Sequence, residues 1–270
     1  MKKAIFFLIL FCHLFSFSGC TIRSREYREY YSHLRRTPFP RPEMQETDYF
    51  LVVLVDACHL DYTNPSSFFN SVAKHPSDGA KTGSVGHAWI YLQSPDCCIE
   101  GGHSGEGNIE QVCYFDGLMD EYERGGRNPV KYLWNTLNDG FFQKGSGGHR
   151  PTFAAKFDLT PRQFQTILDF IHPAHYPYNQ YALTGSQCSS FVEKVLALIG
   201  LDLNTEMTMT LPSSFYFRGE CIHLWDDPAY SQITFASPDE LEKELIRLVE
   251  EGQAEAALSW YSKRANRLSN

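Results

Sequence analysis

The sequence contains no apolar run long enough to span a membrane as a helix. Its N-terminal apolar run, residues 4–17, is shorter than the ~20 residues that a bilayer core requires, and it includes His13. A permanent transmembrane helix is therefore not expected. A basic excess is also missing, because 32 acidic residues outnumber 24 basic ones and give a net charge of −8. Nucleic acid, itself a polyanion, is accordingly not expected as a partner.

The cysteine pattern of a small disulfide scaffold is absent as well. The chain has eight cysteines, but their spacing is irregular and no CxxC pair occurs. No internal repeat is present. A hydrophobic fraction of 43 % is typical of a globular fold, and residues 47–270 suffice for one domain with a sizeable core or for two small ones.

The N-terminus has the layout of a signal peptide, with two lysines before the apolar run. The run ends in Phe-Ser-Gly-Cys, which resembles the bacterial lipobox. By this resemblance residues 1–19 are removed, and the acylated Cys20 anchors the protein to a membrane of the bacterial cell envelope. Simple cleavage and an uncleaved anchor are the alternatives. Residues 20–46 are rich in Arg, Tyr and Pro, which predicts a membrane tether with arginines suited to anionic head groups.

The remaining chain mixes strand patterns with helix patterns. β-Branched and aromatic runs predict strands at 49–55, 87–92 and 152–158, and a short turn joins the second of these to a strand at 97–100. Residues 101–150 are predicted as a long, Gly-rich insertion of irregular structure. Aromatic side chains in the insertion would either shelter an acyl chain or form a satellite core, and the satellite core is favoured.

Three helices are predicted after the insertion. Thr160 and Pro161 have the character of an N-cap and a first helical residue, and this helix ends near Ile171. Residues 188–199 have apolar positions at helical spacing. The C-terminal segment, residues 237–270, is predicted to contain one last helix that ends near residue 264.

Cys188 is a candidate nucleophile because it begins a predicted amphipathic helix, whose free N–H groups favour a thiolate. Lowering a thiol pKa from ~8.5 to ~6 requires about 3.4 kcal/mol. A helix terminus supplies at most about 2 kcal/mol, so a cationic partner, usually His, is needed. Considered alone, Cys188 is better explained as a small buried core residue, the commonest role for a lone cysteine.

His87 is the candidate base because it begins a strand directly after a turn-like stretch, which would hold its side chain on a rigid element. Glu100 closes the next predicted strand and would lie beside His87 in a hairpin. There it would orient the imidazole and stabilise the imidazolium. His103 competes with Glu100 for this orienting role, and each of the three also has a purely structural interpretation.

These segments together resemble the circularly permuted NlpC-type papain-like cysteine hydrolases, a branch with lecithin:retinol acyltransferase relatives and YiiX-like bacterial proteins. The similar segments are Gly-His-Ala-Trp-Ile-Tyr-Leu at 86–92, Ile-Glu at 99–100, and Tyr-Asn-Gln-Tyr-Ala-Leu-Thr-Gly-Ser-Gln-Cys-Ser-Ser-Phe-Val at 178–192. The histidine strand precedes the nucleophile helix, as in that branch. The resemblance covers roughly residues 49–201, and the long insertion departs from the family.

The resemblance implies an α+β, papain-like catalytic domain at residues 47–236, in which an antiparallel sheet packs on helices that include the nucleophile helix. It implies Cys188 as nucleophile, His87 as base and Glu100 as the third polar residue. His103 is the other candidate for that third position. Tyr181 matches a tyrosine that often lines the site in these proteins.

The implied activity is that of a membrane-anchored envelope thiol hydrolase or acyltransferase. The thiolate of Cys188 would attack an amide or ester carbonyl, and the thioester would pass to water or to another acceptor. Peptidoglycan peptides and acyl lipids are the expected substrate classes, and no cofactor is expected. The sequence does not choose between amide and ester or between hydrolysis and transfer, and it leaves the oligomeric state open.

Two interpretations from other classes compete with this one. A metal site would use the ligands His87, Cys97, Cys98, Glu100 and His103, but strand alternation places the two cysteines on opposite faces, so no metal is predicted. A catalytically silent, lipid-anchored binding module with the same fold is the stronger alternative. A disulfide to Cys188 would favour it.

Overall fold

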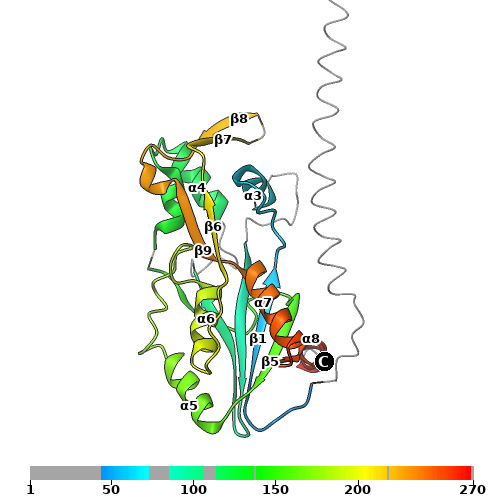
Figure 1. Ribbon diagram of the computed structural model, residues 1–270. Helices are drawn as coiled ribbons and strands as arrows, with labels where there is room; N and C mark the ends of the chain where they lie inside the picture. The colour runs from blue at the N-terminus through cyan, green and yellow to red at the C-terminus, as the bar shows by residue number, and fades with distance from the viewer. Residues whose placement is uncertain (1–43, 73–84, 106–113, 137, 218, 269–270) are drawn as a thin grey trace, which may run out of the picture. The chain divides into compact units, whose positions relative to one another are not determined.

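The computed structural model describes residues 44–72, 85–105, 114–136, 138–217 and 219–268 (Figure 1). The predicted signal peptide, Cys20 and nearly all of the tether lie outside these residues. Among the helices that are described, none combines the length and the apolar character needed to cross a bilayer.

An antiparallel sheet forms the centre of the described chain. Its strands follow the order β10 (Glu255–Ala256), β5 (Phe153–Asp158), β1 (Phe50–Ala57), β2 (Gly86–Gln93), β3 (Cys98–Ser104) and β4 (Phe141–Lys144). The strand β1 lies inside the sheet, and its aliphatic residues from Leu51 to Val55 are fully buried on both faces. The predicted strands and the hairpin that joins β2 to β3 are confirmed.

Side chains alternate across the sheet, so its two faces carry separate hydrophobic cores. On one face, residues such as Val53 and Ile90 pack against α5 (Pro161–Phe170), α6 (Cys188–Ala197) and α7 (Pro238–Glu250). On the other face, Phe50 and Trp89 pack against α8 (Leu258–Leu268) (Figure 1). The chain is therefore α+β, with an antiparallel sheet covered by helices, as predicted at this coarse level.

Local capping interactions determine where α5 begins. The Thr160 hydroxyl accepts a hydrogen bond from the backbone N–H of Gln163, and the Gln163 side chain accepts one in return from the Thr160 backbone. Pro161 occupies the first helical position, where its missing N–H costs nothing. The predicted helix is confirmed.

The C-terminal segment corrects the prediction of one helix between residues 237 and 264. The helix α7 starts after the N-cap Ser237 as expected, but it ends at Glu250. Gly252 has a φ of +73°, a left-handed conformation that glycine adopts without strain, and the Gln253 N–H bonds back to the Leu248 carbonyl. This terminus separates α7 from β10 and α8.

The stretch 101–150 is also more regular than predicted. It contains α4 (Tyr114–Glu123), η2 (Pro129–Trp134) and β4, which pairs with β3. Phe115 and Leu118 of α4 are buried in a second core, which favours the satellite core over an acyl shelter. The other elements near this core are α3 (Pro65–Val72), β6 (Glu206–Thr210), β7 (Ser214–Phe217), β8 (Glu220–His223), η3 (Pro228–Tyr230) and β9 (Gln232–Ala236).

Candidate thiol site

Cys188 is the first residue of α6 and faces the sheet. It is a free thiol and only 2 % exposed. Gln187 caps the helix, since its side-chain oxygen accepts a hydrogen bond from the Ser189 N–H at 2.6 Å. The side-chain nitrogen of Gln187 donates to the Ala236 carbonyl. These two bonds fix the start of the helix, and hence Cys188, against β2.

Hydrogen-bond donors converge on the sulfur of Cys188. Burial raises the pKa of the thiol above its ordinary value. The backbone N–H groups of Ala88 and Ser189 and the hydroxyls of Ser189 and Tyr181 act in the opposite direction, because a thiolate accepts their hydrogen bonds better than a thiol does. Burial outweighs them, so Cys188 rests as a neutral thiol in a site built to receive negative charge.

His87 lies next to this site in sequence, but its ring lies on the opposite face of the sheet. Ala88, and not His87, belongs to the core that contains Cys188, and successive strand residues alternate between faces. The His87 ring stacks on Trp89 and on His149, with centroid distances of 5.7 and 4.5 Å. Burial, assisted by the nearby histidines, lowers the pKa of His87 to about 3, so the imidazole is neutral.

Glu100 does not contact His87 in this structure. Its Oε1 accepts hydrogen bonds from Trp89 Nε1 at 3.2 Å and from the hydroxyl of Tyr261, in α8, at 2.6 Å. The predicted orienting contact between Glu100 and His87 is therefore not formed. Because His87 and Cys188 also face apart, the structure does not bring the three predicted catalytic residues together.

His103 is the histidine that shares a face with Cys188. The His103 ring packs edge-on against Tyr176 and Tyr178, which belong to the same core as Cys188. His103 Nε2 lies 2.7 Å from the Tyr178 carbonyl oxygen, and Nδ1 lies 3.2 Å from the Tyr176 hydroxyl. Since a carbonyl can only accept, Nε2 carries the proton and Nδ1 accepts from the tyrosine. Burial lowers the pKa of His103 to about 4.

Tyr181 connects His103 to the thiol. Its hydroxyl bonds to Cys188, and its ring packs edge-on against the His103 ring at a centroid distance of 4.9 Å. Tyr181 itself is buried in the second core. The site thus lies where the core of the sheet and the second core meet, with Tyr181 belonging to one and Cys188 to the other.

The sequence did not reveal two further polar residues near His87. His149 Nδ1 lies 2.9 Å from Asp56 Oδ2, and the β1–β2 register pairs Asp56 with His87. The only sequence signals were a carboxylate at the end of a buried strand and a histidine after a glycine cluster. No spacing linked the two, because a long stretch of chain separates them.

One buried polar atom of β2, His87 Nε2, has no hydrogen-bond partner among the described residues. His87 is 5 % exposed. Buried polar groups are normally satisfied, so atoms of this kind indicate a place where a substrate, a water molecule or a proton transfer completes the bonding.

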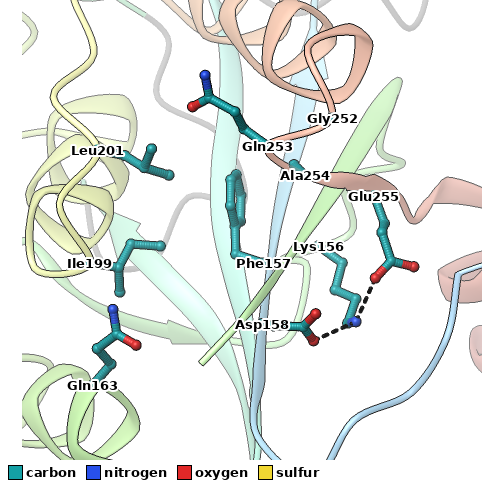
Figure 2. A pocket seen from close by; sticks show the side chains of 10 residues that line it. All are labelled: Lys156, Phe157, Asp158, Gln163, Ile199, Leu201, Gly252, Gln253, Ala254 and Glu255. Carbon is teal, nitrogen blue, oxygen red and sulfur yellow. Dashed lines mark hydrogen bonds and ion pairs between the residues drawn. The ribbon is translucent and has the colours of Figure 1, made fainter. Parts of the chain in front are cut away.

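A pocket of about 390 Å³ lies away from the thiol, at the other end of the sheet (Figure 2). Phe157, Ile199 and Leu201 form an apolar wall, and Lys156 lies below between two carboxylates. Asp158, which lines the pocket, pairs with Phe50 of β1. Ala88, which lies next to Cys188, pairs with Val55, five residues further along β1. Five strand residues span ~16 Å, so this pocket does not open onto Cys188.

The metal-site alternative is not assembled in the described part of the chain. No group of three or more His, Cys, Asp or Glu side chains lies there in positions that could hold an ion. Cys97 and Cys98 are exposed near the β2–β3 turn, and the rings of His87 and His103 lie on opposite faces of the sheet.

Compared with protein-family models, with curated proteins and with solved structures, the chain matches none.

Proposed function

We propose that this chain is a thiol hydrolase or acyltransferase of the circularly permuted, papain-like NlpC type, with Cys188 as its nucleophile. The observation that carries the proposal is the setting of the sulfur. It lies at a helix N-terminus, and hydrogen-bond donors of Ala88, Ser189 and Tyr181 converge on it. A cysteine that only fills a core needs none of these.

The energetics of the site favour a role in the reaction over packing. A buried polar atom without a partner costs about 1–3 kcal/mol, so His87 Nε2 reduces the stability of the fold by about that amount. The donors around Cys188 would stabilise a thiolate once a substrate carbonyl displaces water from the site. The hydrogen bonds of these donors to the sulfur strengthen only when negative charge develops on it.

The proposed reaction begins with transfer of the thiol proton to an imidazole. Cys188 then attacks the carbonyl carbon of an amide or ester, the leaving group takes the proton, and a thioester remains. Attack by water completes hydrolysis, and attack by another hydroxyl or amine completes acyl transfer. The N–H groups at the start of α6 are suited to hold the oxyanion.

Two imidazoles compete for the role of base. His87 Nε2 has no hydrogen-bond partner in the described part of the chain, but its ring stacks on His149 on the opposite face of the sheet from Cys188. His103 shares the face of Cys188, but both of its nitrogens already have partners. We assign the base to His87 because a base needs a free acceptor, with His103 as the alternative.

The proposed setting is the surface of a bacterial envelope membrane, with a lipid on Cys20 and a peptidoglycan peptide or an acyl lipid as substrate. The support for this setting is the signal-peptide layout and the lipobox-like ending of the sequence. A tether of residues 20–46 would keep the thiol within tens of ångströms of the lipid, since a flexible chain reaches ~5–6 Å times the square root of its length.

One observation favours a second candidate, the silent binding module. Cys188 is almost completely buried, and its pKa is raised. A thiol that stays protonated and covered would leave the fold as a binding scaffold.

The test is acylation of the purified mature protein by p-nitrophenyl acyl esters near pH 6, with the modified cysteine identified by mass spectrometry. We expect Cys188 to be acylated faster than the exposed Cys58, Cys97, Cys98 and Cys221, and we expect His87→Ala to abolish the difference. Loss in His103→Ala instead would reassign the base. Acylation of the exposed thiols alone would reject the enzyme in favour of the binding module. Peptidoglycan fragments and phospholipid vesicles, used as competitors, separate the substrate classes.

A further inference from the structure

Asp56, His149 and His87 form a continuous polar row on the α8 face of the sheet. The Asp56 carboxylate accepts a hydrogen bond from His149 Nδ1 at 2.9 Å. The His149 ring then lies nearly parallel to the His87 ring, at 4.5 Å and an interplanar angle of 27°. Because a carboxylate only accepts, this bond fixes both the tautomer and the orientation of His149.

The backbone around His149 is shaped for this position. Gly145, Gly147 and Gly148 have φ values of +69°, +61° and +83°, which only glycine adopts readily. The His149 N–H bonds back to the Ser146 carbonyl at 3.1 Å and closes the turn. The side chain of His149 is 6 % exposed, so the loop places an imidazole in a nearly closed site.

The charged groups around His87 show what this row supplies. Glu100 lies on the same face of the sheet, but its carboxylate is held by Trp89 and Tyr261. His103 approaches from the other face and, like His149, disfavours a positive charge on His87. Among the described residues, Asp56 is the carboxylate that connects to the His87 ring, and it does so through His149.

We propose that Asp56 and His149 are positioning residues for His87, a role that rests on the proposed thiol chemistry. The His149 ring fixes the plane of the His87 ring by stacking. When the proton of the Cys188 thiol passes to His87 Nε2, positive charge develops 4.5 Å from the His149 ring, whose Nδ1 donates a hydrogen bond to the Asp56 carboxylate. The row then takes the orienting role that the sequence assigned to Glu100, while the His149 imidazole itself disfavours a positive charge on His87.

The experiment measures the pH profile of Cys188 acylation in His149→Phe and Asp56→Asn. Phenylalanine keeps a flat ring against His87 but removes the imidazole that disfavours a positive charge on His87, so we expect the acidic limb of the profile to move to higher pH by about half a unit, which is about threefold in proton affinity. Asparagine releases the orientation of His149, and we expect a lower plateau rate, by about tenfold. A packing role alone would move neither the limb nor the plateau.

The matched controls use an exposed acid–histidine pair elsewhere on the surface. His175 Nδ1 lies 3.2 Å from Asp169 Oδ1, with side chains 53 % and 70 % exposed. His175→Phe and Asp169→Asn are expected to leave both the acidic limb and the plateau rate of the pH profile unchanged. Urea unfolding of every variant separates a loss of fold from a loss of positioning.

A second measurement keeps the inference separate from the proposed function. The ring ¹⁵N shifts of His87, recorded at pH 7 in protein with labelled histidine, should change in Asp56→Asn and stay constant in Asp169→Asn. If Cys188 is not acylated in any protein, the proposed function fails and these shifts alone decide the coupling. If Cys188 is acylated but the profiles and shifts of the Asp56 and His149 variants coincide with wild type, the inference is overturned.

Discussion

Acid should destabilise this protein through its buried histidines. Burial, the largest cause in both cases, lowers the pKa of His87 to about 3 and that of His103 to about 4, against ~6.5 in an unfolded chain. As the pH falls below ~6.5, the unfolded chain takes up a proton at each position and the folded chain does not. The stabilising contribution is thus complete above pH ~6.5 and is lost as the pH falls toward the folded pKa values.

The size of the effect follows from the same values. Each neutral histidine reduces the free energy of unfolding by ~1.36 kcal/mol per pH unit in this window. Between pH 6.5 and pH 5 this amounts to about 2 kcal/mol for His87 and about the same for His103. A loss of about 4 kcal/mol is a large fraction of the ~5–15 kcal/mol that stabilises an ordinary domain.

The assay is urea unfolding at pH 7 and pH 5, followed by tryptophan fluorescence. His87→Phe keeps a ring against His149, and we expect it to lose about 2 kcal/mol less than wild type between the two pH values. His175→Phe removes an exposed histidine and should behave as wild type. If wild type and His87→Phe lose equal stability on acidification, the claim that His87 is buried in its neutral form is refuted.

Five other substitutions test the structure at three separate places. Tyr181→Phe removes one hydrogen-bond donor from the Cys188 sulfur and should slow acylation of Cys188 about tenfold. The hydroxyl of Tyr178 bonds to a backbone carbonyl instead, so Tyr178→Phe should leave the rate unchanged. Equal rates in the two variants would contradict the proposed site. Lys156→Met should change the free energy of unfolding, measured with urea, by less than ~1 kcal/mol. Glu255→Gln removes one ion-pair partner of the buried Lys156 ammonium and should reduce the free energy of unfolding by about 1–2 kcal/mol. Gly86→Ala should cost at least about 2 kcal/mol in the same assay, because its φ is +100° and a Cβ would lie 2.5 Å from a β1 carbonyl oxygen.

The elements that the sequence predicted are those determined by local chemistry. The aliphatic run of β1 needs burial on both faces, and the Thr160 cap with Pro161 needs no distant partner. The final helix was predicted as one element because its apolar spacing continues past Gly252. Only the left-handed backbone there, and the pairing of Ala256 with Ala155, end α7 and start a strand.

The site was less predictable because it depends on which face of the sheet receives which helix. Strand alternation was visible in the sequence, and it already separates His87 from Ala88. Whether Ala88 or His87 lies under α6 depends on side-chain volume, since a small residue allows a helix to approach the sheet closely. The Asp56–His149 bond joins a strand to a distant glycine-rich loop, and no local pattern encodes such a contact.

The position of the thiol between two cores has a consequence for local unfolding. Tyr181 is anchored in one core and Cys188 in the other, and a six-residue loop, 182–187, joins them. If the second core opens while the sheet stays folded, Tyr181 leaves and the sulfur is uncovered without global denaturation. Amide hydrogen exchange at Leu183 and at Phe191 would then follow two separate opening free energies. The sulfur of Cys188 would become accessible at the lower of these two opening free energies.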